Sequence, residues 1–399
     1  MGVALLLGFL RNIIFAMLLS PDSMGYYSIA ITISSYGMLL QLGIINGLGR
    51  ELPVSLGGRN LEYASNIVGE TILSVSFLQL LGILIFYVVI LATNFADPST
   101  RQAFLLGSFL AFSIPFNQII MLRLRSEQRV LTFSILQVLS SFAILVIGIV
   151  AIKYFNYTGA ICSIIIINFL TFVIISRMSL SPVSFNNFKL NEIKYLIRIG
   201  LPLMLAGVLA NLQISMDRLF LIKIFSPKDI GVYQIGMLPL TLGVAISGIV
   251  SQYVTPKLFF RYGEGQSLKY IFDKALTVSL VTVGIMILFL PFVPFSSRFI
   301  VDHWLPKYKE SIDIIFVFYV GAIFTSANIV GIVTNAANRQ MLDLYQIAFL
   351  VFISFVAYLL VTHYNMTLIW YAYINTILQV IYFFTTTVVS YYLVKYQKK

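Results

Sequence analysis

Apolar stretches long enough to cross a bilayer recur along the whole chain, and this feature limits the possible folds most. A helical span needs about 20 apolar residues. We identify twelve such stretches, with the approximate limits 2–19, 25–46, 67–93, 103–122, 130–152, 159–176, 199–222, 231–252, 272–293, 313–334, 344–362 and 367–394. Because a chain inside lipid must satisfy its own backbone hydrogen bonds, uniformly apolar runs of this length predict helices.

The composition supports a membrane protein and excludes several other classes. Of the 399 residues, 59% are hydrophobic and only 10% are charged, whereas soluble proteins carry roughly 25% charged residues. A single cysteine, Cys162, excludes a disulfide framework, and two histidines without further cysteines exclude a zinc site. We therefore predict an all-α polytopic membrane protein that needs no metal or cofactor. Its net charge of +11 would face anionic lipid or an anionic cargo, and no nucleic acid.

The distribution of basic residues predicts which side of the membrane each loop faces. Loops after even-numbered spans, together with the C-terminal tail, carry 17 Lys and Arg residues, and loops after odd-numbered spans carry 7. Cytoplasmic loops are enriched in Lys and Arg, so both termini are predicted to be cytoplasmic. The first span begins at Met1 without a basic region or a cleavage site, which predicts a retained helix and no signal peptide.

A repeated motif divides the chain into two halves. Ser20-Pro21-Asp22-Ser23-Met24-Gly25-Tyr26-Tyr27 and Ser226-Pro227-Lys228-Asp229-Ile230-Gly231-Val232-Tyr233 share the pattern S-P-x-x-x-G-x-Y and lie 206 residues apart. Serine before proline, with an acidic residue in the first turn, is typical of a helix start. Each half holds six predicted spans, so both halves enter the membrane from the same side.

Two such halves predict a pseudo-two-fold axis along the membrane normal, with a cargo path between six-helix lobes. The predicted domains are an N-terminal lobe at 1–176, a cytoplasmic linker at 177–198, a C-terminal lobe at 199–394 and a cytoplasmic tail at 395–399. A duplication kept for packing alone is the alternative explanation.

Three groups of residues resemble a known superfamily: the S-P-x-x-x-G-x-Y turn; Asp217-Arg218-Leu219-Phe220 with the second copy of that turn; and Leu305-Pro306-Lys307-Tyr308. Together they are similar to polysaccharide flippases of the multidrug/oligosaccharidyl-lipid/polysaccharide (MOP) exporter superfamily, especially the Wzx-type O-antigen translocases. The resemblance covers nearly the whole chain. In place of the cytoplasmic leader that such proteins carry before the first span, the sequence starts directly with span residues, so we expect either a start slightly downstream of the usual one or the loss of an N-terminal helix turn.

The resemblance implies a function in a bacterial inner membrane. Such proteins carry undecaprenyl-pyrophosphate-linked oligosaccharide from the cytoplasmic to the periplasmic leaflet by alternating access, with two lobes around a cationic cavity. Lipid-linked oligosaccharide, membrane lipids, a polysaccharide polymerase and a chain-length regulator are the implied partners. No covalent chemistry is required, so the protein is not expected to be an enzyme.

Charged residues within spans are the leading candidates for cargo contacts, because such charges are costly in lipid. Arg11 lies within the first span, and the repeat offset places it opposite Asp217, next to Arg218. Guanidinium groups bind phosphate oxygens in a fork, so we expect Arg11 and Arg218 to line a cationic cavity, with snorkelling to the interface as the alternative. Asp217 is expected to hold the arginines by charge pairing, or else to bind a coupling H⁺ or Na⁺.

Residues near the cytoplasmic ends of spans form a second candidate group. Arg50 and Arg123 are placed at the cytoplasmic mouth, where anchoring to anionic lipid is the simpler explanation. Glu70 and Asp273 occupy repeat-related positions and are expected to form interfacial salt bridges at an inner gate. Polar residues inside spans could contact sugars or join helices by hydrogen bonds, namely Gln41, Asn46, Asn117, Gln118, Asn211, Gln213, Asn328 and Gln379.

Other functions remain as alternatives at this point. A drug exporter of the same superfamily and a major-facilitator-type carrier would have a similar span count, although the acidic residue of the latter's usual loop motif is missing after Gly47-Leu48-Gly49-Arg50. A polytopic O-antigen polymerase or glycosyltransferase would need a larger outer loop than any predicted here. The absence of a Walker A motif argues against an ATPase.

Overall fold

The protein is all-helical in a computed structural model that describes residues 2–57, 60–93, 97–178, 189–337 and 339–396. Within these ranges, every regular element is an α-helix or a 3₁₀-helix. The prediction of an all-α polytopic membrane protein is therefore confirmed. The contacts between residues divide the chain into two compact units, Val3–Asn211 and Leu212–Lys399.

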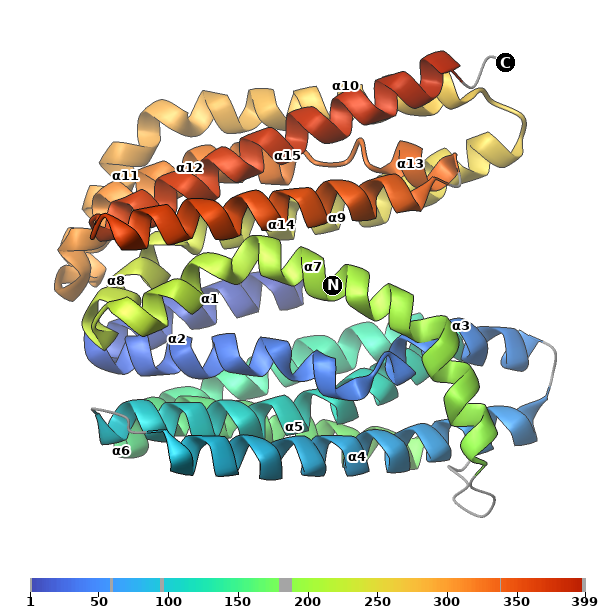
Figure 1. The fold of residues 1–399 in the computed structure, drawn as a ribbon, viewed down its shortest axis with the longest axis horizontal. Helices are drawn as coiled ribbons and strands as arrows, with labels where there is room; N and C mark the ends of the chain where they lie inside the picture. The colour runs from blue at the N-terminus through green and yellow to red at the C-terminus, as the bar shows by residue number, and fades with distance from the viewer. Residues whose placement is uncertain (1, 58–59, 94–96, 179–188, 338, 397–399) are drawn as a thin grey trace. The chain divides into compact units, whose positions relative to one another are not determined.

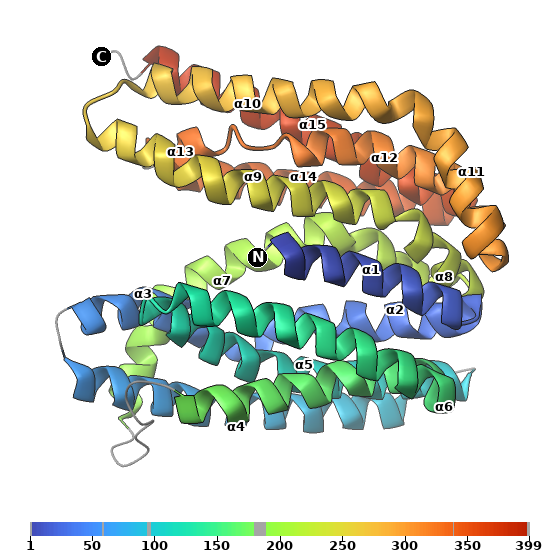
Figure 2. The same ribbon diagram turned by 180° about the vertical axis from the view of Figure 1, so that it is seen from behind.

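The first unit is a helical bundle in which α5 packs against α2, α4 and α6, as Figure 1 and Figure 2 show from opposite sides. A short 3₁₀-helix, η1, contacts α2, α4 and α5. The elements that start in this unit are α1 (Gly2–Leu18), α2 (Pro21–Ser35), η1 (Tyr36–Gln41), α3 (Ile44–Gly57), α4 (Leu61–Ala92), α5 (Pro98–Ser126), α6 (Val130–Met178) and α7 (Leu190–Ile224).

The second unit has α12 at its centre, in contact with α8, α9, α10, α11 and α15, while α14 packs on α15. The end of α7 is followed in this unit by α8 (Pro227–Gly236), α9 (Leu238–Gly263), α10 (Leu268–Phe289), η2 (Leu290–Phe292), α11 (Val293–Trp304), η3 (Pro306–Ser311), α12 (Ile312–Ser326), α13 (Ile332–Ala336), α14 (Gln340–His363) and α15 (Leu368–Tyr396).

The repeated S-P-x-x-x-G-x-Y motif starts a helix in each unit, as predicted. Ser20 caps α2 by accepting a hydrogen bond from the Ser23 backbone N–H at 3.3 Å. Ser226 caps α8 in the same way and forms a capping box with Asp229. Each cap satisfies an N–H group that would lack a partner in the first turn.

A sharp break interrupts the helical segment that follows Ser20. Helices α2 and η1 are bent by 62° relative to α3, because Leu42 and Gly43 have left-handed backbone angles with φ of 49° and 80°. At this break the backbone packs directly on α7, since a Cβ atom added to Gly200 would lie 2.0 Å from the carbonyl oxygen of Gly43. Gln41 before the break and Asn46 after it line the same pocket as residues of α5.

The number of spans differs from the sequence prediction. Eight described helices are long and apolar enough to cross a membrane, or nine if the bent pair counts as one span, where we predicted twelve. The predicted spans 130–152 and 159–176 correspond to the two arms of α6, which counts once among the eight helices although it is broken at Asn156, where φ is 54°. Two others correspond to α1 and α12, whose 17 and 15 residues are shorter than a full span.

The boundary between the compact units lies within a helix. It falls between Asn211 and Leu212, inside α7, which already begins at Leu190. The predicted linker 177–198 therefore includes the first turns of α7, while its residues 179–188 lie outside the described residues. The limits that we assigned to the two lobes stay a prediction.

The contact between Gly43 and Gly200 yields a stability prediction. Gly200→Ala should destabilise the protein by about 1–3 kcal/mol, the usual cost of overpacking, because the added methyl group meets rigid backbone and not a movable side chain. Gly284→Ala is the matched control, since nothing lies within 4 Å of a Cβ at this glycine of α10. It should be neutral or stabilising by up to about 1 kcal/mol. Thermal unfolding of both purified variants in detergent checks this, and equal melting temperatures would contradict it.

Candidate functional site

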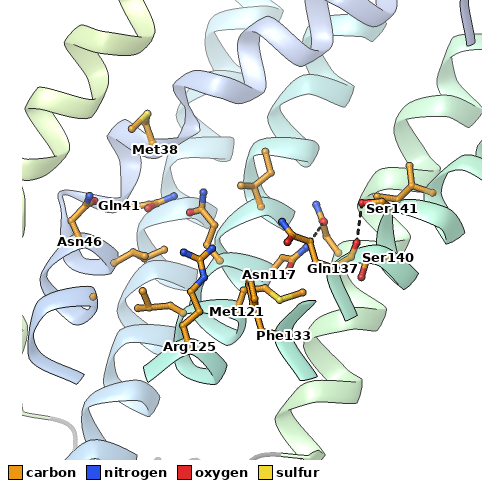
Figure 3. A pocket seen from close by; sticks show the side chains of 17 residues that line it. Met38, Gln41, Asn46, Asn117, Met121, Arg125, Phe133, Gln137, Ser140 and Ser141 are labelled. Atoms are coloured by element: carbon orange, nitrogen blue, oxygen red, sulfur yellow. Dashed lines mark hydrogen bonds between the residues drawn. The ribbon is translucent and has the colours of Figure 1, made fainter. Parts of the chain in front are cut away.

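The first unit contains a pocket of about 650 Å³ between the broken helix, α5 and the two arms of α6. Figure 3 shows side chains from these elements pointing toward one space. The lining residues are mostly amides, hydroxyls and flexible apolar groups: Met38, Gln41, Ile45, Asn46, Gly49, Ile114, Asn117, Gln118, Met121, Leu122, Arg125, Phe133, Gln137, Ser140, Ser141, Ile144 and Asn168.

Hydrogen bonds between helices hold part of this lining in place. Asn117 on α5 donates to the Asn168 side-chain oxygen on α6 at 2.9 Å, and Asn168 donates in turn to the hydroxyl of Ser113 at 3.0 Å. Ser140 and Thr171 join the two arms of α6 through a 3.1 Å contact between their hydroxyls. Such networks stabilise contacts between helices in a membrane, so the lining is a preformed surface.

Two buried acceptors in the pocket lining have no hydrogen-bond partner among the described residues. They are the side-chain oxygens of Asn117 and Gln137. Buried polar atoms in folded proteins are nearly always hydrogen-bonded. A bound ligand or water that donates hydrogen bonds would therefore supply the missing partner of each oxygen.

The pocket carries positive charge and no negative charge. The guanidinium carbon of Arg125 lies 4.4 Å from the centre of the Phe133 ring. In this position the face of the ring stabilises the positive charge of the arginine. The described lining includes no Asp or Glu. The arrangement can therefore bind a neutral polyhydroxyl group through its amides and an anion through Arg125, but it offers no carboxylate to a cationic ligand.

The structure distinguishes polar residues that line the pocket from polar residues that join helices, a distinction that the sequence left open. Gln41, Asn46, Asn117 and Gln118 line the pocket, whereas Asn211 joins helices by donating to Ser35. The sequence analysis missed the contribution of α6, namely Gln137, Ser140, Ser141 and Asn168. A signal was present, because residues 137, 140 and 141 have the i, i+3, i+4 spacing of one helix face.

Asp217 lies at the centre of a buried polar cluster in the second unit. Its side chain is fully buried and accepts hydrogen bonds from the Tyr233 hydroxyl at 2.6 Å and the Asn375 amide at 3.0 Å. The Arg218 Nε atom lies 4.0 Å from the carboxylate, at the limit of an ion pair. The backbone N–H of Arg218 also donates to this carboxylate at 2.8 Å, so Tyr233, Asn375 and the backbone hold Asp217 more closely than the Arg218 guanidinium does.

The two intramembrane arginines belong to different units. Arg11 lies on α1 of the first unit and Arg218 on the part of α7 that belongs to the second. In each case the Nε atom is buried without a hydrogen-bond partner among the described residues. A shared role of Arg11 and Arg218 toward one cargo stays a prediction.

The residues that we assigned to the cytoplasmic mouth have different environments. Arg50 and Asp273 are exposed, while Arg123 is buried and pairs with Glu127 at 3.1 Å. Glu70 is 4% exposed and accepts the Lys189 backbone N–H at 3.1 Å, just before α7 begins. In the described part of the chain, neither Glu70 nor Asp273 forms the expected salt bridge, and their gating role stays a prediction.

Residues 14–301 match the family described as "Polysaccharide biosynthesis protein". No curated protein matches the sequence.

Solved structures share the fold over almost the full length. An inward-facing multidrug resistance transporter of the MATE family in the MOP superfamily is 18% identical, with a TM-score of 0.72 over 99% of this chain and 96% of its own. The lipid II flippase MurJ in an inward closed conformation is 14% identical, with a TM-score of 0.76 over 97% and 85%. A MOP superfamily transporter from Pyrococcus furiosus is 16% identical, with a TM-score of 0.63 over 98% and 94%. At these identities the likeness establishes the fold alone. Together with the family match over residues 14–301, the shared fold confirms the predicted resemblance.

The buried Asp217 cluster yields a second prediction. Tyr233→Phe removes a hydrogen bond to a carboxyl group and should destabilise the protein by about 1.5–3 kcal/mol, the range for bonds to charged groups. Tyr371→Phe is the matched control, because the hydroxyl of this equally buried tyrosine is hydrogen-bonded to a neutral group, the hydroxyl of Thr362, at 2.9 Å. Its loss should cost about 0.5–1.5 kcal/mol. Urea titration of both variants in detergent measures the difference, and a larger loss in Tyr371→Phe would contradict the assignment.

Proposed function

Because the chain belongs to the polysaccharide biosynthesis protein family, we propose that it is a flippase that moves an undecaprenyl-pyrophosphate-linked oligosaccharide from the cytoplasmic to the periplasmic leaflet. The cargo is a repeat unit of O-antigen or of another surface polysaccharide. The observation that carries the proposal is the pocket of the first unit, which combines amides, hydroxyls and Arg125 without a carboxylate.

This lining suits the polar head of such a lipid. Sugar hydroxyls donate and accept hydrogen bonds, and each amide side chain does both. The unpartnered oxygens of Asn117 and Gln137 would accept from sugar hydroxyls, while the fork of Arg125 would hold a phosphate. Arg125 lies one residue before the end of α5, at the end that we assign to the cytoplasmic side, where the cargo is made.

Drug export is the second candidate, because the fold is shared with multidrug transporters of the MATE family. A cationic drug would require a carboxylate near its charge, and the described lining of this pocket has none. The buried Asp217 could instead serve such a role in the second unit, so the two candidates differ in which unit binds the cargo. A polymerase or glycosyltransferase has less support, since the solved structures that share the fold are transporters.

The remaining parts of the proposal concern coupling and location. We place the protein in the bacterial inner membrane with both termini in the cytoplasm, acting with a polymerase and a chain-length regulator. Arg11 and Arg218 would contact the anionic head during transport. Asp217, held by Tyr233 and Asn375, would orient Arg218 or take up H⁺ or Na⁺ in a coupling step.

Deletion of the gene tests the proposed function in the cell. Lipid-linked repeat units should accumulate on the cytoplasmic leaflet, and long-chain surface polysaccharide should be lost, because the polymerase would receive no substrate. Surface polysaccharide is measured by gel electrophoresis and leaflet position by access of a membrane-impermeant glycosidase. Normal polysaccharide in a strain without a second flippase would exclude the proposal, whereas changed drug sensitivity alone would favour the second candidate.

Truncation of Arg125 tests the role of the pocket. Arg125→Ala removes a charge-assisted contact worth about 1.5–3 kcal/mol, which corresponds to roughly ten- to hundred-fold weaker binding of the cargo. Arg125→Lys should retain part of the binding, because lysine keeps the positive charge but cannot bind two phosphate oxygens at once. Arg198→Ala is the control, since Arg198 is an exposed cation of the same unit that does not line the pocket. Binding is measured by displacement of a labelled sugar pyrophosphate lipid from purified protein, and equal effects of both alanine variants would contradict the site.

A further inference from the structure

A second, apolar pocket lies beside the polar one in the first unit. It has a volume of about 320 Å³ and opens between η1, α4 and α5. Its lining is almost entirely apolar: Ile33, Tyr36, Gly37, Leu39, Leu40, Gly82, Ile83, Ile85, Phe86, Val89, Ser108 and Ala111. Ile85 and Val89 are 57% and 52% exposed, so the pocket is open at the surface of α4.

The short helix η1 is the wall between the two pockets. Its residues Tyr36, Gly37, Leu39 and Leu40 line the apolar pocket, whereas Met38 and Gln41 line the polar one. The wall is anchored by Gln79 on α4, which is fully buried and donates to the Gly37 carbonyl oxygen at 3.0 Å. Two chemically opposite cavities are therefore separated by the thickness of a single helix.

Glycines allow this wall to pack closely on its neighbours. A Cβ atom at Gly37 would lie 2.6 Å from the Ala111 methyl group on α5, and one at Gly82 would lie 2.4 Å from the Leu40 side chain. Both distances are too short for real side chains. The close packing holds η1 firmly against α4 and α5, so the wall between the two pockets is thin and fixed in place.

The order of the pockets along α5 matches the order of groups in a lipid. Ser108 and Ala111 line the apolar pocket, and Asn117 and Arg125, further along the same helix, line the polar one. At 1.5 Å per residue, Ala111 lies about 9 Å from Asn117 and about 21 Å from Arg125 along the axis. With the end of α5 on the cytoplasmic side, the polar pocket lies near the membrane surface and the apolar pocket toward its middle.

We propose that the apolar pocket binds the first isoprenoid units of the lipid carrier while the sugar-phosphate head occupies the polar pocket. This inference rests on the proposed function and identifies where the tail of the cargo is held. A methyl-branched, unsaturated chain suits an apolar pocket with the aromatic rings of Tyr36 and Phe86 in its lining. The protein would thus recognise the junction between head and tail and leave the distal part of the chain in the bilayer.

Filling the pocket tests the proposal. Val89→Trp places a bulky ring in the pocket, and Val88→Trp is the matched control, because Val88 is the preceding residue of α4, is 57% exposed and does not line the pocket. Purified protein in liposomes is photolabelled with a polyprenyl phosphate that carries a diazirine in the isoprene units nearest the phosphate. Displacing even two methylene groups from an apolar site weakens binding about tenfold, so labelling should fall about tenfold in Val89→Trp and stay unchanged in Val88→Trp.

The location of the label and a competition arm complete the test. Labelled peptides should map to η1 and the adjoining part of α4, and excess phosphatidylglycerol should not compete. Equal labelling of both tryptophan variants, labels elsewhere, or full competition by phosphatidylglycerol would overturn the proposal, the last by indicating a general acyl-chain site. A wild-type protein that is labelled at η1 but transports no lipid-linked sugar would instead refute the proposed function and leave the tail site in place.

Discussion

The break at Leu42 and Gly43 is the constraint on which the first unit depends. Backbone that leaves the helical pattern at membrane depth is tolerated only where protein or a water-filled cavity satisfies its polar groups. Here Gln79 holds the Gly37 carbonyl oxygen, and direct backbone packing of Gly43 on Gly200 fixes the direction in which α3 continues. A straight helix would present one face to α5, whereas the broken one presents a polar pocket on one side of η1 and an apolar pocket on the other.

Positions related by the repeat offset carry charges of opposite sign in the two units, Arg11 in the first and Asp217 in the second. The repeat offset relates Arg11 to Asp217 and Tyr27 to Tyr233. In the second unit Tyr233 donates to the buried Asp217, while in the first unit Tyr27 packs edge-on against Phe15 at 5.9 Å, one turn from Arg11. The buried Asp217 carboxylate requires hydrogen-bond donors, and Tyr233 and Asn375 provide them. The longer Arg11 side chain can instead reach polar surroundings beyond its own helical turn. Positions related by the same sequence offset therefore carry different chemistry in the two units.

Electrostatics and shape together separate the candidate cargoes. A pocket with one arginine, several amides and no carboxylate among its described lining residues favours a polyhydroxyl anion over a cation, because an ammonium group taken out of water without a counter-charge pays its full desolvation cost. The neighbouring apolar pocket adds selectivity for an amphiphile, since a soluble sugar phosphate would leave that surface unused. The two features fit the polar head and apolar tail of a single lipid.

The sequence by itself determined the helical class, the membrane location and the internal repeat, because hydrophobic run length and helix-start residues are local properties of the chain. It also identified Gln41, Asn46, Asn117 and Gln118 as unusual polar residues within spans. It placed the two arms of α6 as separate stretches, 130–152 and 159–176, on either side of the kink at Asn156. It did not show that the helices α1 and α12 are shorter than full spans. Only the tertiary structure decided that Gln137 and Asn168 join Asn117 around one cavity and that Asp217 is held by Tyr233 and Asn375. These are contacts between residues up to 158 positions apart, and they depend on how helices rotate and pack, which no local pattern encodes.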